Sequence, residues 1–249
     1  MTGGVDRLPL PRAILLDLDD TILDDSSLVG DCWQGACADQ SARFAPIEAE
    51  VVAETIRRTS RWFWGDPERH RSGRLELEAA RREVARLALL EIGIDDRSLA
   101  DSIGDGYSRR RDAMMAPLPD AIETVQWLRE SGVRLALLTN GAGPPQRKKI
   151  IRFGLSGLFD AILVEGELGY GKPDERVFRD ALDRLGVEPR DAWMIGDNLE
   201  WDVAAPQRLG IFAIWIDRRG RGLSPDSTVR PDRVITSLGE IKSTVVSRQ

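Results

Sequence analysis

The sequence predicts an α/β protein built on a parallel sheet, with a helical segment inserted early in the chain. Short apolar runs of strand length recur, and from residue 133 onward helical patterns separate them, which is typical of βαβ units. Because the runs are apolar throughout rather than alternating, helices should cover both faces of the sheet. The runs are Ala13–Leu16, Val133–Leu138, Ala161–Val164, Ala192–Ile195 and Ile211–Ile216.

The helices of this α/β part are expected over Pro145–Phe153, Glu175–Leu185 and Glu200–Leu209. The interval after the first run is too long for one crossover. Apolar positions at helical spacing within it predict one helix from Leu77 and another from Ile47, the latter broken at Asp66–Pro67. A further helix is expected from Asp96 to Arg111. We therefore expect residues 25–116 to form a helical insert in a core made of residues 1–24 and 117–249.

Composition excludes several classes of function. The net charge is -6 and the pI about 5.1, so no overall positive field attracts nucleic acid or a membrane surface. No apolar run approaches the roughly 20 residues of a membrane span. The apolar stretch Ala13–Leu16 leads directly into aspartates, unlike a signal peptide. The prediction is a soluble, cytoplasmic protein.

Rare residue types narrow the chemistry further. His70 is the only histidine, which excludes paired-histidine metal sites and histidine-nucleophile phosphatases that need a second histidine. Lysine occurs only four times among 35 basic residues, so each lysine stands where arginine would be the usual choice. Cys32 and Cys37 are expected to be reduced thiols.

Four polar segments of the core carry the candidate chemistry. Ligands bind beyond the carboxyl ends of parallel strands, so segments that follow different strands should meet at one edge of the sheet. The segments are Asp17-Leu18-Asp19-Asp20-Thr21, Thr139-Asn140-Gly141, Gly169-Tyr170-Gly171-Lys172-Pro173, and Gly196-Asp197-Asn198 with Asp202 beyond it.

This convergence needs a cation. Two carboxylates about 4 Å apart repel by about 4 kcal/mol at an effective dielectric constant near 20. A hard divalent ion with oxygen ligands would stabilise Asp17, Asp19 and Asp197, with Asp202 behind them, and few carboxylates plus a substrate phosphate suit Mg²⁺. Lys172 would supply a compact second positive charge for phosphate.

The same residues supply a phosphoryl-transfer mechanism. Asp17 is the candidate nucleophile, and Asp19 could protonate the leaving alcohol and then activate water. The Thr139 hydroxyl could bind the transferring phosphoryl group. Backbone N–H groups after Asp17 and Thr139, those of Leu18, Asp19 and Asn140, would bind its remaining oxygens.

The four segments, in this order, resemble the four motifs of the haloacid dehalogenase superfamily. The resemblance covers the chain from Ala13 to about Ile216 and implies a Rossmann-like core with a mobile helical cap inserted after the first motif. It implies that Asp17 is the nucleophile and Asp19 the acid/base. It also implies that Asp17, the backbone carbonyl of Asp19 and Asp197 hold Mg²⁺.

The remaining motif positions also acquire roles from the resemblance. Lys172 and Thr139 would bind phosphate, and Asp202 would contact Lys172 or a water on the metal. The dehalogenases and phosphonate-cleaving members lack an aspartate at the position of Asp19, so its presence favours phosphate chemistry. The segment from Thr139 through Lys172 is similar to the branch containing N-acylneuraminate-9-phosphatase and nucleotide phosphatases.

The expected function is therefore a Mg²⁺-dependent hydrolase of small phosphomonoesters, of the sugar phosphate or nucleotide class, that forms a phospho-aspartate. The alternatives are a phosphomutase, a dehalogenase, or a non-catalytic module that binds a phosphorylated ligand. The Asp20-Thr21 pair, in place of a glycine after the second aspartate, modestly favours the hydrolase over a mutase. The sequence does not decide which of Mg²⁺, Mn²⁺ and Co²⁺ is preferred. It also does not decide between a monomer and a homodimer.

Structural interpretations compete at several positions. Asp202 could begin the following helix, Asn140 and Asn198 could shape loops, and Glu165 is expected behind the site or on the surface. Thr21 is interpreted as a hydrogen-bonding neighbour of the site. The residues expected only in turns are Asp20, Asp24 and Asp25.

Two groups of residues in the insert can likewise be interpreted as structural or as functional. Trp62, Phe63 and Trp64 are expected in its core rather than as a platform for substrate. The basic group from Arg69 to Arg74 is interpreted as a solvated face, with a rim for a second anionic group of the substrate as the alternative. Hinges are expected near Asp24–Ser27 and Ala116–Pro119.

Overall fold

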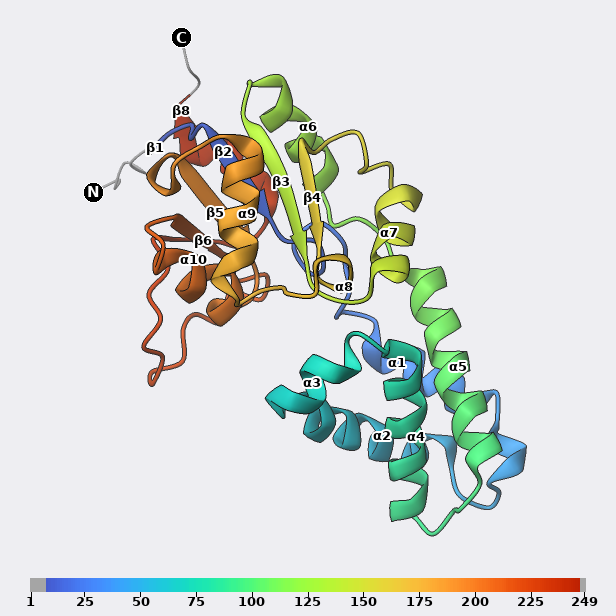
Figure 1. The fold of residues 1–249 in the computed structure, drawn as a ribbon. Coiled ribbons are helices and arrows are strands. Elements are labelled where there is room, and N and C mark those ends of the chain that lie inside the picture. Colours follow the sequence, from blue (N-terminus) through green and yellow to red (C-terminus); the bar gives the residue numbers. More distant parts are fainter. Residues whose placement is uncertain (1–7, 247–249) are drawn as a thin grey trace. The chain divides into compact units, whose positions relative to one another are not determined.

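The structure, a computed structural model, describes residues 8–246. The chain divides into two compact units, which we call the sheet unit (Met1–Asp24 and Ala116–Gln249) and the helical unit (Asp25–Met115). Figure 1 shows the sheet in the first and only helices and loops in the second. The expected insert was one residue longer: the carbonyl of Ala116 accepts a hydrogen bond from the amide of Asp24 (2.9 Å), which ties Ala116 to the sheet unit.

The sheet unit contains a six-stranded, fully parallel sheet in the order β4-β3-β2-β5-β6-β7. Counted within this sheet, the order is 3-2-1-4-5-6, which reverses between β2 and β5. In doubly wound sheets ligands bind at that reversal, beyond the carboxyl ends of the strands. The strands are β2 (Ala13–Leu16), β3 (Arg134–Thr139), β4 (Ala161–Val164), β5 (Ala192–Gly196), β6 (Phe212–Ile216) and β7 (Arg233–Ile235).

The predicted α/β class is confirmed, and all five apolar runs are strands with ends shifted by at most one residue. All four residues of β2 are fully buried, as expected for a central strand with both faces covered. The sixth strand, β7, was not expected because it is a short edge strand that begins with Arg233 and has no apolar run. A separate parallel pair joins β1 (Leu8–Pro9) to β8 (Val245–Val246).

Helices cover the sheet, and α9 packs on it against β3 and β4 through Phe178 and Leu182 (Figure 1). The helix expected over residues 200–209 is instead a wide π-type turn followed by one short α turn. Pro206 accounts for this, because it has no amide hydrogen to bond the preceding turn. The helices are α6 (Ala121–Glu130), α7 (Gly143–Arg152), α8 (Glu165–Leu168), α9 (Glu175–Leu185), η2 (Pro189–Asp191), η3 (Leu199–Ala204), α10 (Ala205–Gln207), η4 (Leu238–Glu240) and α11 (Ile241–Thr244).

The helical unit has its own apolar core, to which α1, α2, α4 and α5 contribute buried side chains such as Trp33, Ile56, Val84 and Leu99. The helix that was expected to break at Asp66–Pro67 does end before these residues, and a new helix begins directly after Asp66, whose side chain caps it. The elements are α1 (Val29–Ala38), η1 (Ser41–Arg43), α2 (Ala49–Trp64), α3 (Pro67–Gly73), α4 (Leu77–Glu91) and α5 (Arg97–Met114).

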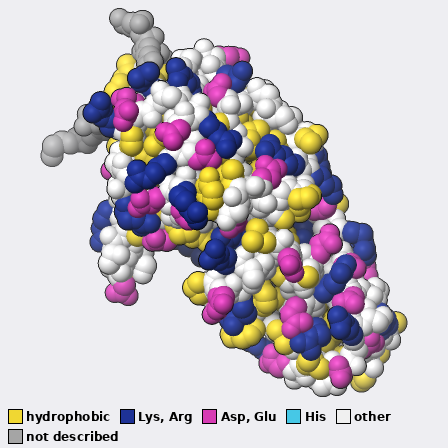
Figure 2. Space-filling view, viewed as in Figure 1, with side chains coloured by type: hydrophobic (Ala, Val, Ile, Leu, Met, Phe, Trp, Pro, Cys, Tyr) yellow, Lys and Arg dark blue, Asp and Glu magenta, His cyan; other side chains and the backbone are white. Residues whose placement is uncertain are grey.

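One expectation for the helical unit is wrong. Phe63 is buried and Trp64 packs on the core, but Trp62 is 56% exposed and lies under the guanidinium of Arg69. Cys32 and Cys37 are buried free thiols. On the face drawn in Figure 2, acidic and basic side chains are interspersed. Among residues 8–246, no helix combines the length and hydropathy needed to cross a bilayer.

Candidate active site

The polar residues predicted to converge follow neighbouring strands of the sheet unit. Asp17 follows β2, Thr139 ends β3 and Asp197 follows β5, and β2 lies between β3 and β5. Lys172 joins them from the segment after β4: its Nζ lies 2.6 Å from Oδ1 of Asp17 and 2.7 Å from Oδ1 of Asp202. Four separate parts of the sequence therefore meet at the point where the strand order reverses.

Lys172 is a buried ammonium between two carboxylates. Its side chain is 2% exposed, and that of Asp202 is 1% exposed. Burial by itself lowers the pKa of Lys172, but the charges of Asp17 and Asp202 and the hydrogen bonds to them raise it above its usual value. The lysine is therefore a permanent positive charge at this site.

The backbone of Lys172 is fixed by the segment after β3. The Asn140 side chain accepts from the Lys172 amide (2.9 Å) and donates to the Lys172 carbonyl (2.7 Å). A side chain on Gly171 would place its Cβ 2.5 Å from Oδ1 of Asn140, so only glycine permits this approach. Buried Glu165 accepts from the amide of Gly141 (2.9 Å), which holds the same loop. Asn140 and Glu165 thus position the loops that carry the lysine.

Asp17, Asp197 and Asp202 form a compact acidic group, with one oxygen of each within 4.8 Å of the others. Burial raises the pKa of Asp17 to about 7, because the charge of Lys172 offsets only part of the desolvation and Asp202 adds to it. Burial, with the charges of Asp17 and Asp202, raises the pKa of Asp197 to about 8. One lysine does not neutralise three carboxylates, so the group suits a hard divalent cation.

Asp202 differs from the other two carboxylates because both of its oxygens have protein partners. Oδ1 accepts from Lys172, and Oδ2 accepts from the amide of Asn198 (3.0 Å). The Asn198 side chain, not Asp202, caps the following turn by accepting from the amides of Glu200 and Trp201. Asp202 is therefore suited to orient the lysine and the loop rather than to bind an ion through a free oxygen.

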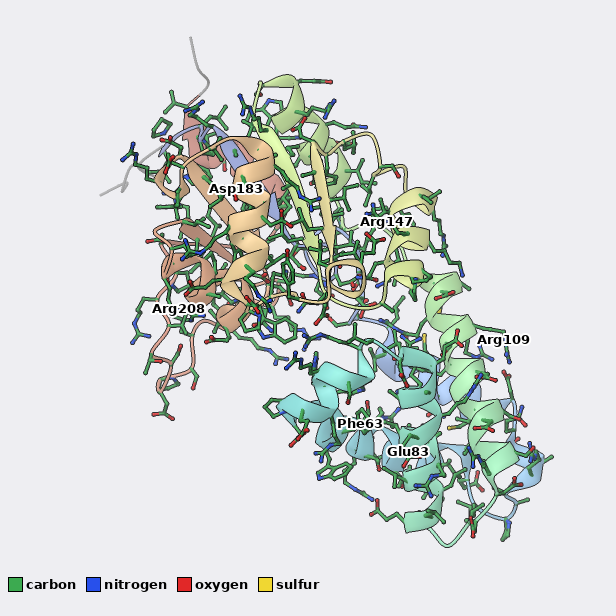
Figure 3. The ribbon with its side chains drawn as sticks, in the orientation of Figure 1. Phe63, Glu83, Arg109, Arg147, Asp183 and Arg208 are labelled. Atoms are coloured by element: carbon green, nitrogen blue, oxygen red, sulfur yellow. The ribbon has the colours of Figure 1, made fainter. Side chains whose placement is uncertain are left out.

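Two side chains of helix α7 bind the carboxylate of Asp19, and the sequence did not predict these contacts. Lys149 Nζ lies 2.8 Å from both carboxylate oxygens of Asp19, and Gln146 Nε2 lies 2.9 Å from Oδ2. Gln146 also donates to the hydroxyl of Thr139, which is 3% exposed. An ion pair from Arg147, labelled in Figure 3, to Glu167 joins α7 to α8. Because lysine is rare in this chain, the occurrence of Lys149 ten residues after Thr139 could have indicated that it belongs to the site.

A second unpredicted contact holds the loop after Asp19. Asp20 has a left-handed backbone (φ 63°), which is uncommon outside glycine. Arg218, just beyond β6, donates to Asp20 (2.7 Å) and to Asp24 (3.2 Å). Both aspartates, expected only in turns, are therefore ionic partners of one arginine.

Two further residues of the first motif lie beneath the surface. Leu18 is fully buried, so only its backbone can face a ligand. Thr21 is 1% exposed, and its hydroxyl makes no hydrogen bond to any residue between 8 and 246.

Comparisons with known proteins give the family and the fold of the chain. The haloacid dehalogenase-like hydrolase family matches residues 11–210. A phosphoserine phosphatase of Thermus thermophilus is 35% identical over 250 residues, covering 92% of this chain and 97% of that protein. An N-acylneuraminate-9-phosphatase of Rattus norvegicus is 35% identical over 156 residues, 62% of each chain. The fold matches a magnesium-bound crystal structure of the HAD-hydrolase YfnB from Bacillus subtilis, with a TM-score of 0.72, 22% identity, and 94% and 98% of the two chains covered.

Proposed function

The chain belongs to the haloacid dehalogenase-like hydrolase family, and we propose that it is a magnesium-dependent phosphatase that forms a phospho-aspartate on Asp17. The predicted family and the predicted class of enzyme, a hydrolase of phosphate monoesters, are confirmed. The metal and the mechanism are our proposal, and they rest on the contacts of Asp17.

The observation that carries the mechanism is the asymmetric environment of the Asp17 carboxylate. Lys172 holds Oδ1 at 2.6 Å, whereas Oδ2 makes no hydrogen bond to any described residue. One oxygen is thus anchored and the other is available to attack phosphorus. An anchored, buried carboxylate has little freedom to lose on reaction, which favours attack in a fixed direction.

Two steps follow from this arrangement. Oδ2 of Asp17 attacks phosphorus, and the ester oxygen leaves with a proton from Asp19. A water molecule, deprotonated by Asp19, then attacks the phosphorus of the acyl phosphate and releases inorganic phosphate and the free Asp17 carboxylate. Lys149 and Gln146 keep the Asp19 carboxylate in place for both transfers.

The phosphoryl oxygens would be bound by the Lys172 ammonium, the Thr139 hydroxyl and the backbone amides of Leu18, Asp19 and Asn140. The carboxylates of Asp17 and Asp197 and the carbonyl of Asp19 would hold Mg²⁺. Mg²⁺ supplies charge neutralisation for phosphoryl transfer.

We assign the substrate to small phosphorylated metabolites, because the two curated relatives are named for phosphoserine and for N-acylneuraminate 9-phosphate. The helical unit is proposed as a cap that closes over bound substrate and excludes water, with hinges near Asp24–Ser27 and Ala116–Pro119. We place the enzyme in the cytoplasm, as a monomer or homodimer.

The test is phosphate release from a panel of phosphomonoesters, with Mg²⁺ and with EDTA. Asp17→Asn should lower kcat by at least about a thousandfold. Asp183→Asn, an exposed change on α9, should leave it unaltered. Acid-quenched wild type should carry phosphate on the peptide that contains Asp17. Release that persists in EDTA or in Asp17→Asn would refute the mechanism, and turnover without free phosphate would indicate a mutase.

A further inference from the structure

Arg218, just beyond β6, contacts the loop that carries one of the proposed metal ligands. Its Nη1 donates to Oδ1 of Asp20 (2.7 Å) and to Oδ1 of Asp24 (3.2 Å). In the sheet, β5 lies between β2 and β6 (Figure 1), so this ion pair joins the loops on either side of the one that follows β5. Arg218 lies outside the four motifs and takes no part in the two steps proposed above.

The turn that carries Arg218 is itself fixed. The amide of Asp217 donates to the carbonyl of Ile235 on β7 (2.8 Å). The Asp217 carboxylate, on a residue 8% exposed, accepts from the amide of Gly222 (2.6 Å), and the amide of Gly220 donates to the Asp217 carbonyl (3.0 Å). Because its own turn is already closed, the arginine can hold a neighbouring loop with little further loss of conformational freedom.

The loop that Arg218 holds has an unusual backbone. Asp20 has a φ of 63°, a left-handed conformation that residues with a Cβ adopt rarely. Its amide donates to the carbonyl of Leu23 (2.7 Å), and the amides of Ile22 and Leu23 both donate to the carbonyl of Leu18 (2.9 Å each). The chain thus closes a tight loop from Leu18 to Leu23, in which Asp20 is the only residue with a positive φ.

The peptide between Asp19 and Asp20 connects this conformation to the metal. The peptide is planar and trans, so its carbonyl and its amide point in opposite directions. The amide of Asp20 points at Leu23, and the carbonyl of Asp19 therefore points away from Leu23. That carbonyl is a proposed ligand of Mg²⁺. A change of Asp20 to a negative φ would rotate this peptide and turn the carbonyl with it.

We propose that Arg218 is a positioning residue for the magnesium site: by holding the Asp20 carboxylate, it keeps Asp20 left-handed and the Asp19 carbonyl turned toward the metal. The inference rests on the proposed function, of which the metal is a part. Side chains that orient metal ligands from behind strengthen metal binding without contacting the ion. Arg218 acts in this way, through Asp20 alone.

The charge of Arg218 gives the test a clear sign. A cation beside a metal-binding loop repels Mg²⁺, so loss of that charge alone should strengthen Mg²⁺ binding, whereas loss of positioning should weaken it. In titration calorimetry on metal-free protein, Arg218→Met should weaken Mg²⁺ binding about tenfold. Arg219→Met, which removes the same charge from the exposed neighbouring position, should not weaken it. Unchanged or tighter binding in Arg218→Met would overturn the inference.

Two substitutions of Asp20 test whether Arg218 acts through it. Asp20→Ala and Asp20→Gly both remove the carboxylate, but only glycine adopts a positive φ readily. Asp20→Ala should therefore weaken Mg²⁺ binding about tenfold, and Asp20→Gly by less than about threefold. Arg218→Met added to Asp20→Gly should cause no further loss, because the backbone no longer needs the ion pair. Equal losses in the two Asp20 variants, or a full effect of Arg218→Met beside glycine, would refute the role.

The metal titration does not depend on turnover, and urea unfolding of each variant establishes that it is folded. If wild type releases phosphate and Arg218→Met binds Mg²⁺ as tightly as wild type does, the positioning role fails and the proposed function stands. If wild type binds Mg²⁺ but hydrolyses no ester, the proposed function fails and the calorimetric comparison still decides the role of Arg218. A wild type that binds no Mg²⁺ would overturn both.

Discussion

Lys172 in the sheet unit is held by two carboxylates, whereas Arg81 in the helical unit forms no ion pair with residues 8–246 and instead donates to a hydroxyl and lies over an aromatic ring. The charge of Lys172 is thus balanced by carboxylates of the protein itself, and that of Arg81 is not balanced by an ion pair within residues 8–246. A residue that acts on every substrate needs a fixed position, which protein contacts provide.

This difference affects how each site can be recognised. The residues around Lys172 belong to the four motifs, so the family resemblance of the sequence indicated which residues would gather there. The contacts of Arg81 with Ser108 and the Tyr107 ring, in contrast, appear only in the structure, because arginine, serine and tyrosine in helices are ordinary in sequence. Three substitutions test the comparison, from the largest expected effect to the smallest.

Lys172→Met should have the largest effect. The substitution leaves Asp17 and Asp202 buried without their shared cation, and breaking such a pair costs about 3–5 kcal/mol of stability. Phosphate release should fall by at least about a hundredfold, because the phosphoryl group loses a fixed positive charge. Urea unfolding and phosphate release measure the two effects. Lys242→Met, at an exposed position of α11, is the matched control. A stable, active Lys172→Met enzyme would show that the compensated cation is dispensable.

Lys149→Met should have an intermediate effect that depends on the leaving group. Lys149 contacts both oxygens of Asp19, and Gln146 still holds one of them in the variant. We expect kcat for an alkyl phosphate to fall about tenfold, and that for p-nitrophenyl phosphate much less, because nitrophenolate departs without a proton. The exposed neighbouring change Lys148→Met should leave both values unaltered. Equal losses on the two substrates would show that Lys149 does not act through Asp19.

The sequence predicted the central strands and the meeting of the four motifs, because long apolar runs and strand-end polar residues are local patterns. It did not predict that Gln146 and Lys149 contact Asp19, because this depends on the position of α7 relative to the loop after β2. It also did not predict Arg218, whose loop lies beyond the last motif. Trp62 was misjudged because three adjacent aromatic residues on a helix face in different directions, so they cannot all be buried.

Tyr107→Phe should have the smallest effect on folding and thereby gives the sharpest test of the comparison. The substitution keeps the stack on Trp33 and removes only a hydroxyl that bonds to no described residue, so the free energy of unfolding should change by less than about 0.5 kcal/mol. Thr124→Val in the sheet unit also removes a buried hydroxyl, but this one donates to the carbonyl of Asp120 (2.7 Å), and it should cost about 1 kcal/mol. Urea unfolding of both variants measures the difference. A Tyr107→Phe cost equal to that of Thr124→Val would mean that the hydroxyl has a hydrogen-bond partner inside the protein.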